Sequence, residues 1–344
     1  METLLDRRNL LLSMFDSSGF GLEVGPSYSP LVPKKLGYNV ETVDYADAAQ
    51  LREKYRTDSS VDINNIEDVD YVSDGGSLVT LIGEAGRYDY IVASHVIEHV
   101  TDVVRFLSDC EQLLKPSGVL VLAVPDKRFC FDALRPVSTV GSAIQTYLDA
   151  PSRHSPGMVF DHCSLVSKKD GDIVWLEPSL DGVELISTIA DAKAALDQAR
   201  NQAEYIDIHR WQFTPNYFRY FIRVLEESGF IGLRETEFYK NKADGLSLHE
   251  FYISLSRAGA GPGMPVIDLL KLAHAELREI KVSIRGGADA HAGAEYDARD
   301  PFTALAGARD ELRSARAELD AMRQSTSWRL TAPIRSVKRL LSRR

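Results

Sequence analysis

The sequence contains few cysteines and no long apolar run. Its three cysteines, Cys110, Cys130 and Cys163, include no pair with C-x-x-C spacing. This pattern argues against a disulfide framework and a thiolate zinc site, and favours a reducing compartment. The longest apolar run covers only residues 119–124, whereas a bilayer span needs about 20 residues. We therefore expect a cytoplasmic protein, and we interpret the N-terminal 20 residues as a helix rather than a signal peptide.

Positive charge is scarce outside the C-terminal end. The net charge is −10, yet residues 323–344 contain seven basic residues and no acidic one. An acidic body binds nucleic acid poorly, so we expect no nucleic-acid partner. The basic segment has apolar residues that roughly share one helical face. It predicts a peripheral contact with the inner face of the membrane or with a partner protein, and a solvated tail is the alternative.

Strand-like and helix-like segments alternate along the first 125 residues. Residues 101–115 follow a helical period. Alternation of this kind predicts an α/β, doubly wound, Rossmann-like fold with a seven-stranded, mostly parallel sheet. The last strand is expected to be antiparallel. The expected strands are 20–24, 38–44, 69–74, 88–94, 119–124, 231–239 and 248–255.

The pattern changes along the chain and suggests its organisation. We expect one domain over residues 1–257, with a substrate lid inserted at 126–210, where the periodicity weakens. A linker follows at 258–264. Residues 265–344 are expected to form a helical extension that ends in the basic amphipathic tail.

The loop after the first expected strand lacks the glycines of a dinucleotide fingerprint. In the segment GLEVGPS only Gly25 is in place, which disfavours NAD and FAD. Asp44 follows 19 residues later at the end of the second strand, where a carboxylate can bind ribose hydroxyls. The alternative is a cap for a helix at 46–55. Similarly, Asp74-Gly75 could receive an adenine amino group or form a simple turn.

Four segments in order carry a family resemblance: GLEVGPS, VETVDY, YDYIVASHVIEHV and LLKPSGVLVLAVP. This order resembles the class I S-adenosylmethionine-dependent methyltransferases, and more narrowly their bacterial type 11-like branch. The resemblance implies S-adenosyl-L-methionine as cofactor. It also implies that Ser94 and His95 face the sulfonium and the substrate. The remaining implied cofactor residues are Glu23, Gly25, Pro26 and Ser27 at the methionine end, Asp44 at the ribose, and Asp74 and Gly75 at the adenine.

Methyl transfer to a hydroxyl group needs a base. The candidates are His95, His162 and His209, with Asp126 and Asp161 behind them, and a structural hydrogen-bonding role is the alternative for each histidine. His95-x-x-Glu98-His99 also resembles a metal-binding segment of some RNA-end methyltransferases. We expect no metal here and favour a hydrogen-bonding role for Glu98 and His99.

The substrate class rests on two weaker features. Lys127, Arg128 and Arg135 follow the fifth strand, where they could meet an anionic or polyhydroxyl acceptor or form a solvated loop. The segment STSWRLTAPIR is similar to one that ends many glycosyltransferases of bacterial surface-polysaccharide clusters. We therefore expect O-methylation of a sugar or other small polar acceptor in surface-glycan biosynthesis. The alternatives are a non-catalytic scaffold of a glycan-assembly complex and an NAD-dependent sugar oxidoreductase.

Overall fold

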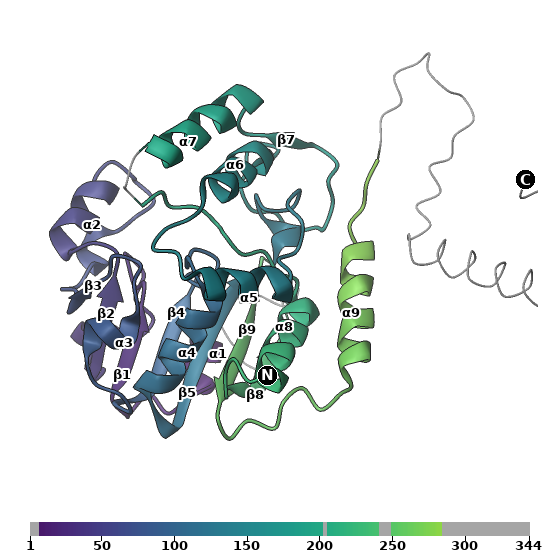
Figure 1. Cartoon of the computed structure of the whole chain (residues 1–344). Helices are drawn as coiled ribbons and strands as arrows, with labels where there is room; N and C mark the ends of the chain where they lie inside the picture. Colours follow the sequence, from purple (N-terminus) through teal and green to yellow (C-terminus); the bar gives the residue numbers. More distant parts are fainter. Residues whose placement is uncertain (1–6, 202–204, 241–248, 284–344) are drawn as a thin grey trace, which may run out of the picture. The chain divides into compact units, whose positions relative to one another are not determined.

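A seven-stranded sheet organises the protein in this computed structural model, which describes residues 7–201, 205–240 and 249–283 (Figure 1). The strand order is β3-β2-β1-β4-β5-β9-β8, and only β9 runs antiparallel to its neighbours. The predicted doubly wound, mostly parallel sheet is thus confirmed. The strands are β1 (Gly21–Val24), β2 (Val40–Asp44), β3 (Tyr71–Val72), β4 (Tyr88–Ser94), β5 (Leu114–Pro125), β8 (Arg234–Tyr239) and β9 (Glu250–Ser256).

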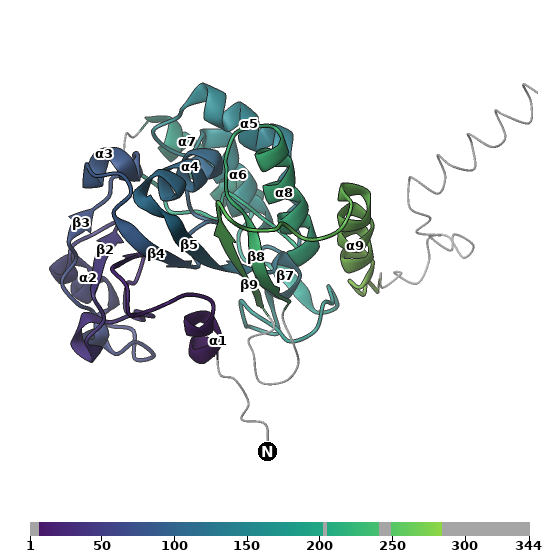
Figure 2. The ribbon, with the colours of Figure 1, turned by 90° about the horizontal axis from the view of Figure 1, so that it is seen from below.

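Helices cover both faces of this sheet, and Figure 2 shows α1 on one face with α4 and α8 on the other. The larger core joins α4, α5 and α8 to the sheet, and the smaller core joins α1 to the opposite face. Central strands buried on both faces explain their nearly continuous apolar sequences. The helices are α1 (Arg7–Ser13), α2 (Ala48–Tyr55), α3 (Leu78–Ile82), α4 (Val103–Leu113), α5 (Val140–Asp149) and α8 (Pro215–Glu227).

The ends of α4 and α8 follow local sequence signals. The Asp102 carboxylate accepts a hydrogen bond from the Arg105 N–H at 3.0 Å and caps α4. Pro215 occupies the first turn of α8, where its fixed φ suits a helix and its missing N–H costs nothing. Thr214 is the N-cap residue as expected, but its side chain makes no capping hydrogen bond.

The connection from β1 to β2 contains no α-helix. Its only helical element is the 3₁₀ turn η1 (Lys34–Leu36), because prolines at 26, 30 and 33 prevent a continuous helix. The buried Glu23 carboxylate holds the loop instead. It accepts hydrogen bonds from the Leu31 and Val32 N–H groups at 2.6 and 3.1 Å. A further 3₁₀ turn, η2 (Ile63–Asn65), precedes β3.

The expected lid region forms a helical and hairpin layer beyond β5. Figure 1 shows α6, α7 and β7 grouped together on one side of the sheet. The end of this segment is hydrogen-bonded to the turn that follows β4. There the Glu98 carbonyl accepts hydrogen bonds from the Arg210 and Trp211 N–H groups. Besides α5, its elements are η3 (Lys127–Phe129), α6 (Pro156–Leu165), β6 (Ser167–Lys169), β7 (Val183–Leu185) and α7 (Ile189–Asn201).

The compact unit extends to Ser283 and therefore includes α9 (Val266–Arg278). Residues from 265 onward were expected to form an extension, whereas α9 belongs to the compact unit and is bonded to α8. Its buried Glu276 accepts hydrogen bonds from both the backbone and the side-chain amide of Asn216. Among the described residues, no helix is long and apolar enough to cross a membrane. The basic segment at 323–344 lies outside the described residues.

Candidate active site

The carboxyl ends of β1 and β4 meet where the strand order reverses, which is the usual ligand crevice of a doubly wound sheet. Gly25 follows β1 with a φ of 70°, in the left-handed region. A Cβ atom at Gly25 would lie 2.6 Å from Val96 Cγ2, beyond the end of β4. Only glycine fits here, and its bare backbone is what a closely approaching cofactor requires.

Asp44 ends β2 beside this crevice. Its buried carboxylate accepts hydrogen bonds from the Ser27 N–H at 2.9 Å and from the Tyr45 N–H at 2.8 Å. Burial raises its pKa above the ordinary value. Asp47, rather than Asp44, caps α2 through a reciprocal pair of hydrogen bonds with Gln50. The alternative helix-cap role of Asp44 is therefore wrong, and its ribose role stays a prediction.

Substitution of Asp44 by alanine is expected to weaken S-adenosylhomocysteine binding by about 1–3 kcal/mol, because a buried acceptor for hydroxyl groups is lost. Calorimetric titration measures this change. Asp47→Ala is the matched control, since it removes a neighbouring carboxylate that serves only the start of α2. Equal affinities in the Asp44 variant and the control would remove Asp44 from the cofactor site.

The other implied cofactor residues differ in what they contact. Both Glu23 oxygens accept hydrogen bonds from the backbone of residues 31 and 32, so this side chain fixes the loop between β1 and β2. Ser27 has a φ of 45°, and its hydroxyl lies 3.3 Å from the Tyr55 hydroxyl. The exposed Asp74 accepts a hydrogen bond from the Gly76 N–H, which forms the simple turn considered above. Contacts of Pro26, Ser27, Asp74 and Gly75 with the cofactor stay predictions.

Glu23 gives the fold a specific pH dependence. Burial raises its pKa to about 7, against an unfolded value of 4.5. The stability that this proton contributes is full below pH 4.5 and is lost as the pH rises through about 7. We expect Glu23→Gln to flatten this decline, whose slope is at most about 1.4 kcal/mol per pH unit. Urea unfolding of both proteins from pH 5 to 8 is the measurement, and parallel curves would contradict the assignment.

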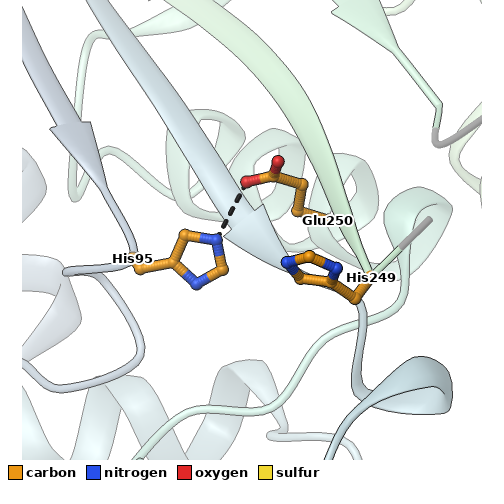
Figure 3. A group of neighbouring side chains, drawn as sticks. All are labelled: His95, His249 and Glu250. Carbon is orange, nitrogen blue, oxygen red and sulfur yellow. Dashed lines mark hydrogen bonds and ion pairs between the residues drawn. The ribbon is translucent and has the colours of Figure 1, made fainter. Parts of the chain in front are cut away.

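His95 lies directly after β4 with a φ of 55°, a conformation uncommon for a residue other than glycine. Figure 3 shows its ring facing the Glu250 carboxylate, with the His249 ring nearby. His95 Nε2 lies 2.9 Å from Glu250 Oε2. Its Nδ1 lies 3.4 Å from Glu98 Oε1. Burial alone would lower the pKa of His95, but the two carboxylates outweigh burial and raise this pKa to about 9.

Glu250 is fixed from several sides. Arg7, from α1, donates to both of its oxygens at 2.6 and 2.9 Å, and the Tyr252 hydroxyl donates at 2.8 Å. Arg7 also donates to the Ser94 hydroxyl at 2.6 Å. Glu250 is completely buried, so these donors stabilise its negative charge and fix the position of its carboxylate. The fixed carboxylate in turn orients the His95 ring.

The three candidate bases gather around Glu98 and Phe131. His209 Nε2 lies 4.0 Å from Glu98 Oε1, while His209 Nδ1 lies 2.5 Å from Asp132 Oδ2. The His162 and His209 rings lie 6.3 Å apart, and both flank Phe131. Burial lowers the pKa of His162 to about 4, so this imidazole is neutral at physiological pH. The structure thus collects residues from three distant segments into one site.

The basic residues after β5 do not form the expected acceptor loop. Lys127, Arg128 and Arg135 are each less than 5% exposed. Lys127 donates to the Ala133 carbonyl, Arg128 pairs with Asp126, and Arg135 pairs with Asp132. Both interpretations of these side chains, substrate contact and solvated loop, are therefore wrong, because each cation has a buried partner.

Sequence reasoning missed several members of the site. Arg7, Asp132, His249 and Glu250 were not singled out, although each lies next to a predicted residue. A single signal was available: Glu250 is an acidic residue at the start of an otherwise apolar strand, EFYISLS. Such a charge needs a buried partner, but the sequence does not say which.

The sheet order, the glycine turn and the buried carboxylate at the switch point are features of a Rossmann-like domain with a ligand crevice at its strand ends. A family model described as methyltransferase domain matches residues 2–176, half of the chain, and the chain belongs to this family. S-adenosylmethionine is its cofactor. Gly25 and Asp44 fit that group, since one leaves room for it and the other offers carboxylate oxygens at the crevice.

Several known proteins are similar over part or most of the chain. The ubiquinone biosynthesis O-methyltransferase of Rhodopseudomonas palustris (strain TIE-1) is 44% identical over 52 residues, 15% of this chain and 21% of that protein. The chain thus spans about a fifth of the length of such curated relatives. The methyltransferase CcbJ from Streptomyces caelestis is 15% identical with a TM-score of 0.38, covering 73% of this chain and 88% of its own. A methyltransferase from Aquifex aeolicus is 11% identical with a TM-score of 0.35, covering 73% and 89%.

Proposed function

We propose that this enzyme methylates a hydroxyl group of a small polar acceptor, with a sugar of a surface glycan or its precursor as the first choice. The observation that carries the proposal is His95, held by Glu250 at the end of β4 and next to the cofactor crevice. The similarity to O-methyltransferases of ubiquinone biosynthesis supports oxygen as the acceptor atom.

A hollow beside this dyad suits a polar acceptor. It has a volume of about 270 Å³ and is lined by residues 169, 170, 172 and 174–177 and by His249, whose ring centroid lies 5.9 Å from that of His95. Its lining includes Lys169, Asp172 and Glu177, which offer both donors and acceptors for hydroxyl groups.

The proposed reaction needs alignment and the removal of one proton. The acceptor oxygen forms a bond to the methyl carbon while the carbon–sulfur bond breaks, releasing S-adenosylhomocysteine. The hydroxyl proton passes to His95 Nδ1, the ring nitrogen that Glu250 does not engage, once that nitrogen has lost its own proton. Because the pKa of His95 is about 9, the neutral form that acts as base becomes more abundant as the pH rises toward that value. Positioning and exclusion of water supply the rest of the rate, because the sulfonium methyl is already activated. His162 and His209 are the second choices for the base.

An acceptor panel tests the proposal. The full chain is incubated with methyl-labelled S-adenosylmethionine and, separately, with nucleotide sugars, free sugars, phenols and amines. Label on a sugar oxygen is the expected result. Label on phenols alone would contradict a sugar acceptor and make a phenol the acceptor class. Label on nitrogen would contradict O-methylation. Cofactor turnover without any transfer to these acceptors would also count against it.

We also propose that residues 323–344 bring the enzyme to an anionic membrane surface or to a glycosyltransferase. The support is their basic and amphipathic sequence. Cosedimentation of the full chain with anionic and with neutral vesicles tests the membrane contact. Equal cosedimentation with both would rule out a charge-driven contact.

A further inference from the structure

Glu98 is a buried carboxylate that faces the imidazoles of His95, His99 and His209. Its side chain is 1% exposed, and neither oxygen has a hydrogen-bond partner within the described ranges. Removing an ionised carboxylate from water without close partners is costly. The hydrogen-bonding role expected from the sequence is seen at His99, which bonds to Asp207, but not at the Glu98 side chain. The nearest cation is the His95 imidazole, whose Nδ1 lies 3.4 Å from Glu98 Oε1, and a further positive charge would offset more of the cost of burial.

Two imidazoles face Glu98 through the same ring nitrogen. His99 Nε2 and His209 Nε2 lie 3.9 and 4.0 Å from Glu98 Oε1, too far for hydrogen bonds. The three candidate ligand atoms all lie within 4.8 Å of one another. Tetrahedral ligands of a zinc-sized ion lie about 3.4 Å apart. Modest inward movements of these side chains would therefore enclose an ion.

Carboxylates on the far side of both rings fix the tautomers that such a site needs. His99 Nδ1 lies 2.7 Å from Asp207, and His209 Nδ1 lies 2.5 Å from Asp132. With the Nδ1 protons directed at these carboxylates, each Nε2 presents its lone pair toward Glu98. Histidines that bind metals are usually held in this way.

The backbone keeps the ligands together without an ion. Glu98 and His99 lie in the turn after β4, whereas His209 comes from the segment that precedes α8. The Arg210 and Trp211 N–H groups donate to the Glu98 carbonyl at 2.6 and 3.1 Å. Since these hydrogen bonds join the two segments directly, the folded backbone places the three ligands close together before any ion binds.

We propose that Glu98, His99 and His209 bind one divalent transition-metal cation. Two imidazole nitrogens and one carboxylate oxygen suit ions such as Zn²⁺ and Co²⁺, whereas Mg²⁺ and Ca²⁺ prefer oxygen ligands. Three protein ligands leave coordination positions open. In the proposed O-methylation, a hydroxyl bound in an open position would lose its proton more readily.

Metal titration tests this site without turnover. Untagged full chain is stripped with EDTA and titrated with Co²⁺, followed by visible absorption and then by displacement with Zn²⁺. We expect saturation at one ion per chain and no displacement by Mg²⁺. Glu98→Gln and His209→Gln should each lower the affinity by about 100-fold or more, and Asp132→Asn by about 10- to 100-fold. His162→Gln, a matched histidine change beside the site, should leave it unchanged.

Two results would overturn the proposal: no saturable binding at this ratio, or equal Co²⁺ affinity in the wild type and both ligand variants. Titration with S-adenosylhomocysteine reports separately on the folded cofactor site. Retained cofactor binding in Glu98→Gln, with metal binding lost, supports the site. Failure of metal binding in a protein that still binds and uses the cofactor overturns the metal alone and leaves the proposed function standing.

Discussion

Replacement of His95 by asparagine is expected to lower the rate of methyl transfer by about 10²- to 10⁴-fold, because the group proposed to receive the hydroxyl proton is lost. Asparagine is the suitable replacement, since it tolerates the left-handed conformation that residue 95 adopts. Affinity for S-adenosylhomocysteine should change little. A single-turnover assay with labelled cofactor measures the rate, and calorimetry measures the affinity.

His274→Asn, on the exposed face of α9, is the matched control for this experiment. It changes the same side chain outside the site and should retain the full rate. A full rate in the His95 variant would transfer the role of base to His162 or His209. Glu250→Gln should produce a smaller loss, since it leaves the imidazole in place and removes only the carboxylate that orients it.

Substitution of Arg128 by leucine is expected to reduce the free energy of unfolding by about 3–5 kcal/mol. Arg128 is 1% exposed, and its guanidinium donates to Asp126 at 2.6 Å and to the Glu276 carbonyl at 3.1 Å. The change removes a cation from a buried carboxylate and also releases α9 from the base of the inserted region. Urea unfolding monitored by circular dichroism measures the loss.

Two comparisons make the Arg128 result specific. Arg223→Leu removes an arginine from a partly exposed i,i+4 pair with Glu227, which is worth about 0.3–0.5 kcal/mol. The double change Asp126→Asn with Arg128→Leu should recover part of the stability, because no charge is then left buried opposite leucine. A loss in Arg128→Leu as small as that in Arg223→Leu would show that the buried pair contributes little.

The sheet could be predicted because its strands carry strong local patterns. The expected strand at 88–94 matches β4 completely, and the helix expected at 101–115 contains α4 at 103–113. Apolar runs between turn residues leave few alternatives there. The β1–β2 connection was harder, because three prolines and a buried glutamate replace the usual helix with a pinned loop.

The site could be predicted only in part. His95 and Asp44 follow strands, and their place at the carboxyl edge follows from the topology. Glu250 and Asp132 have no such positional rule. They meet His95 and His209 across sequence separations of 155 and 77 residues, through contacts that only the folded chain defines. Asp47 was predictable, since it is followed three positions later by Gln50, which completes a capping box.

The hydrogen bonds that join Arg7 to Glu250 connect positions 243 residues apart. Since β9 also lies between β5 and β8, the sheet closes only after this late segment has been inserted. During synthesis, the ribosome must therefore release nearly the whole domain before the His95 imidazole acquires its partner. A nascent chain that ends before β9 contains β1, β2 and β4 with their loops, but not the hydrogen-bonded pair of His95 and Glu250. The enzyme is consequently completed late, and long-range closure of this kind is slow compared with helix formation.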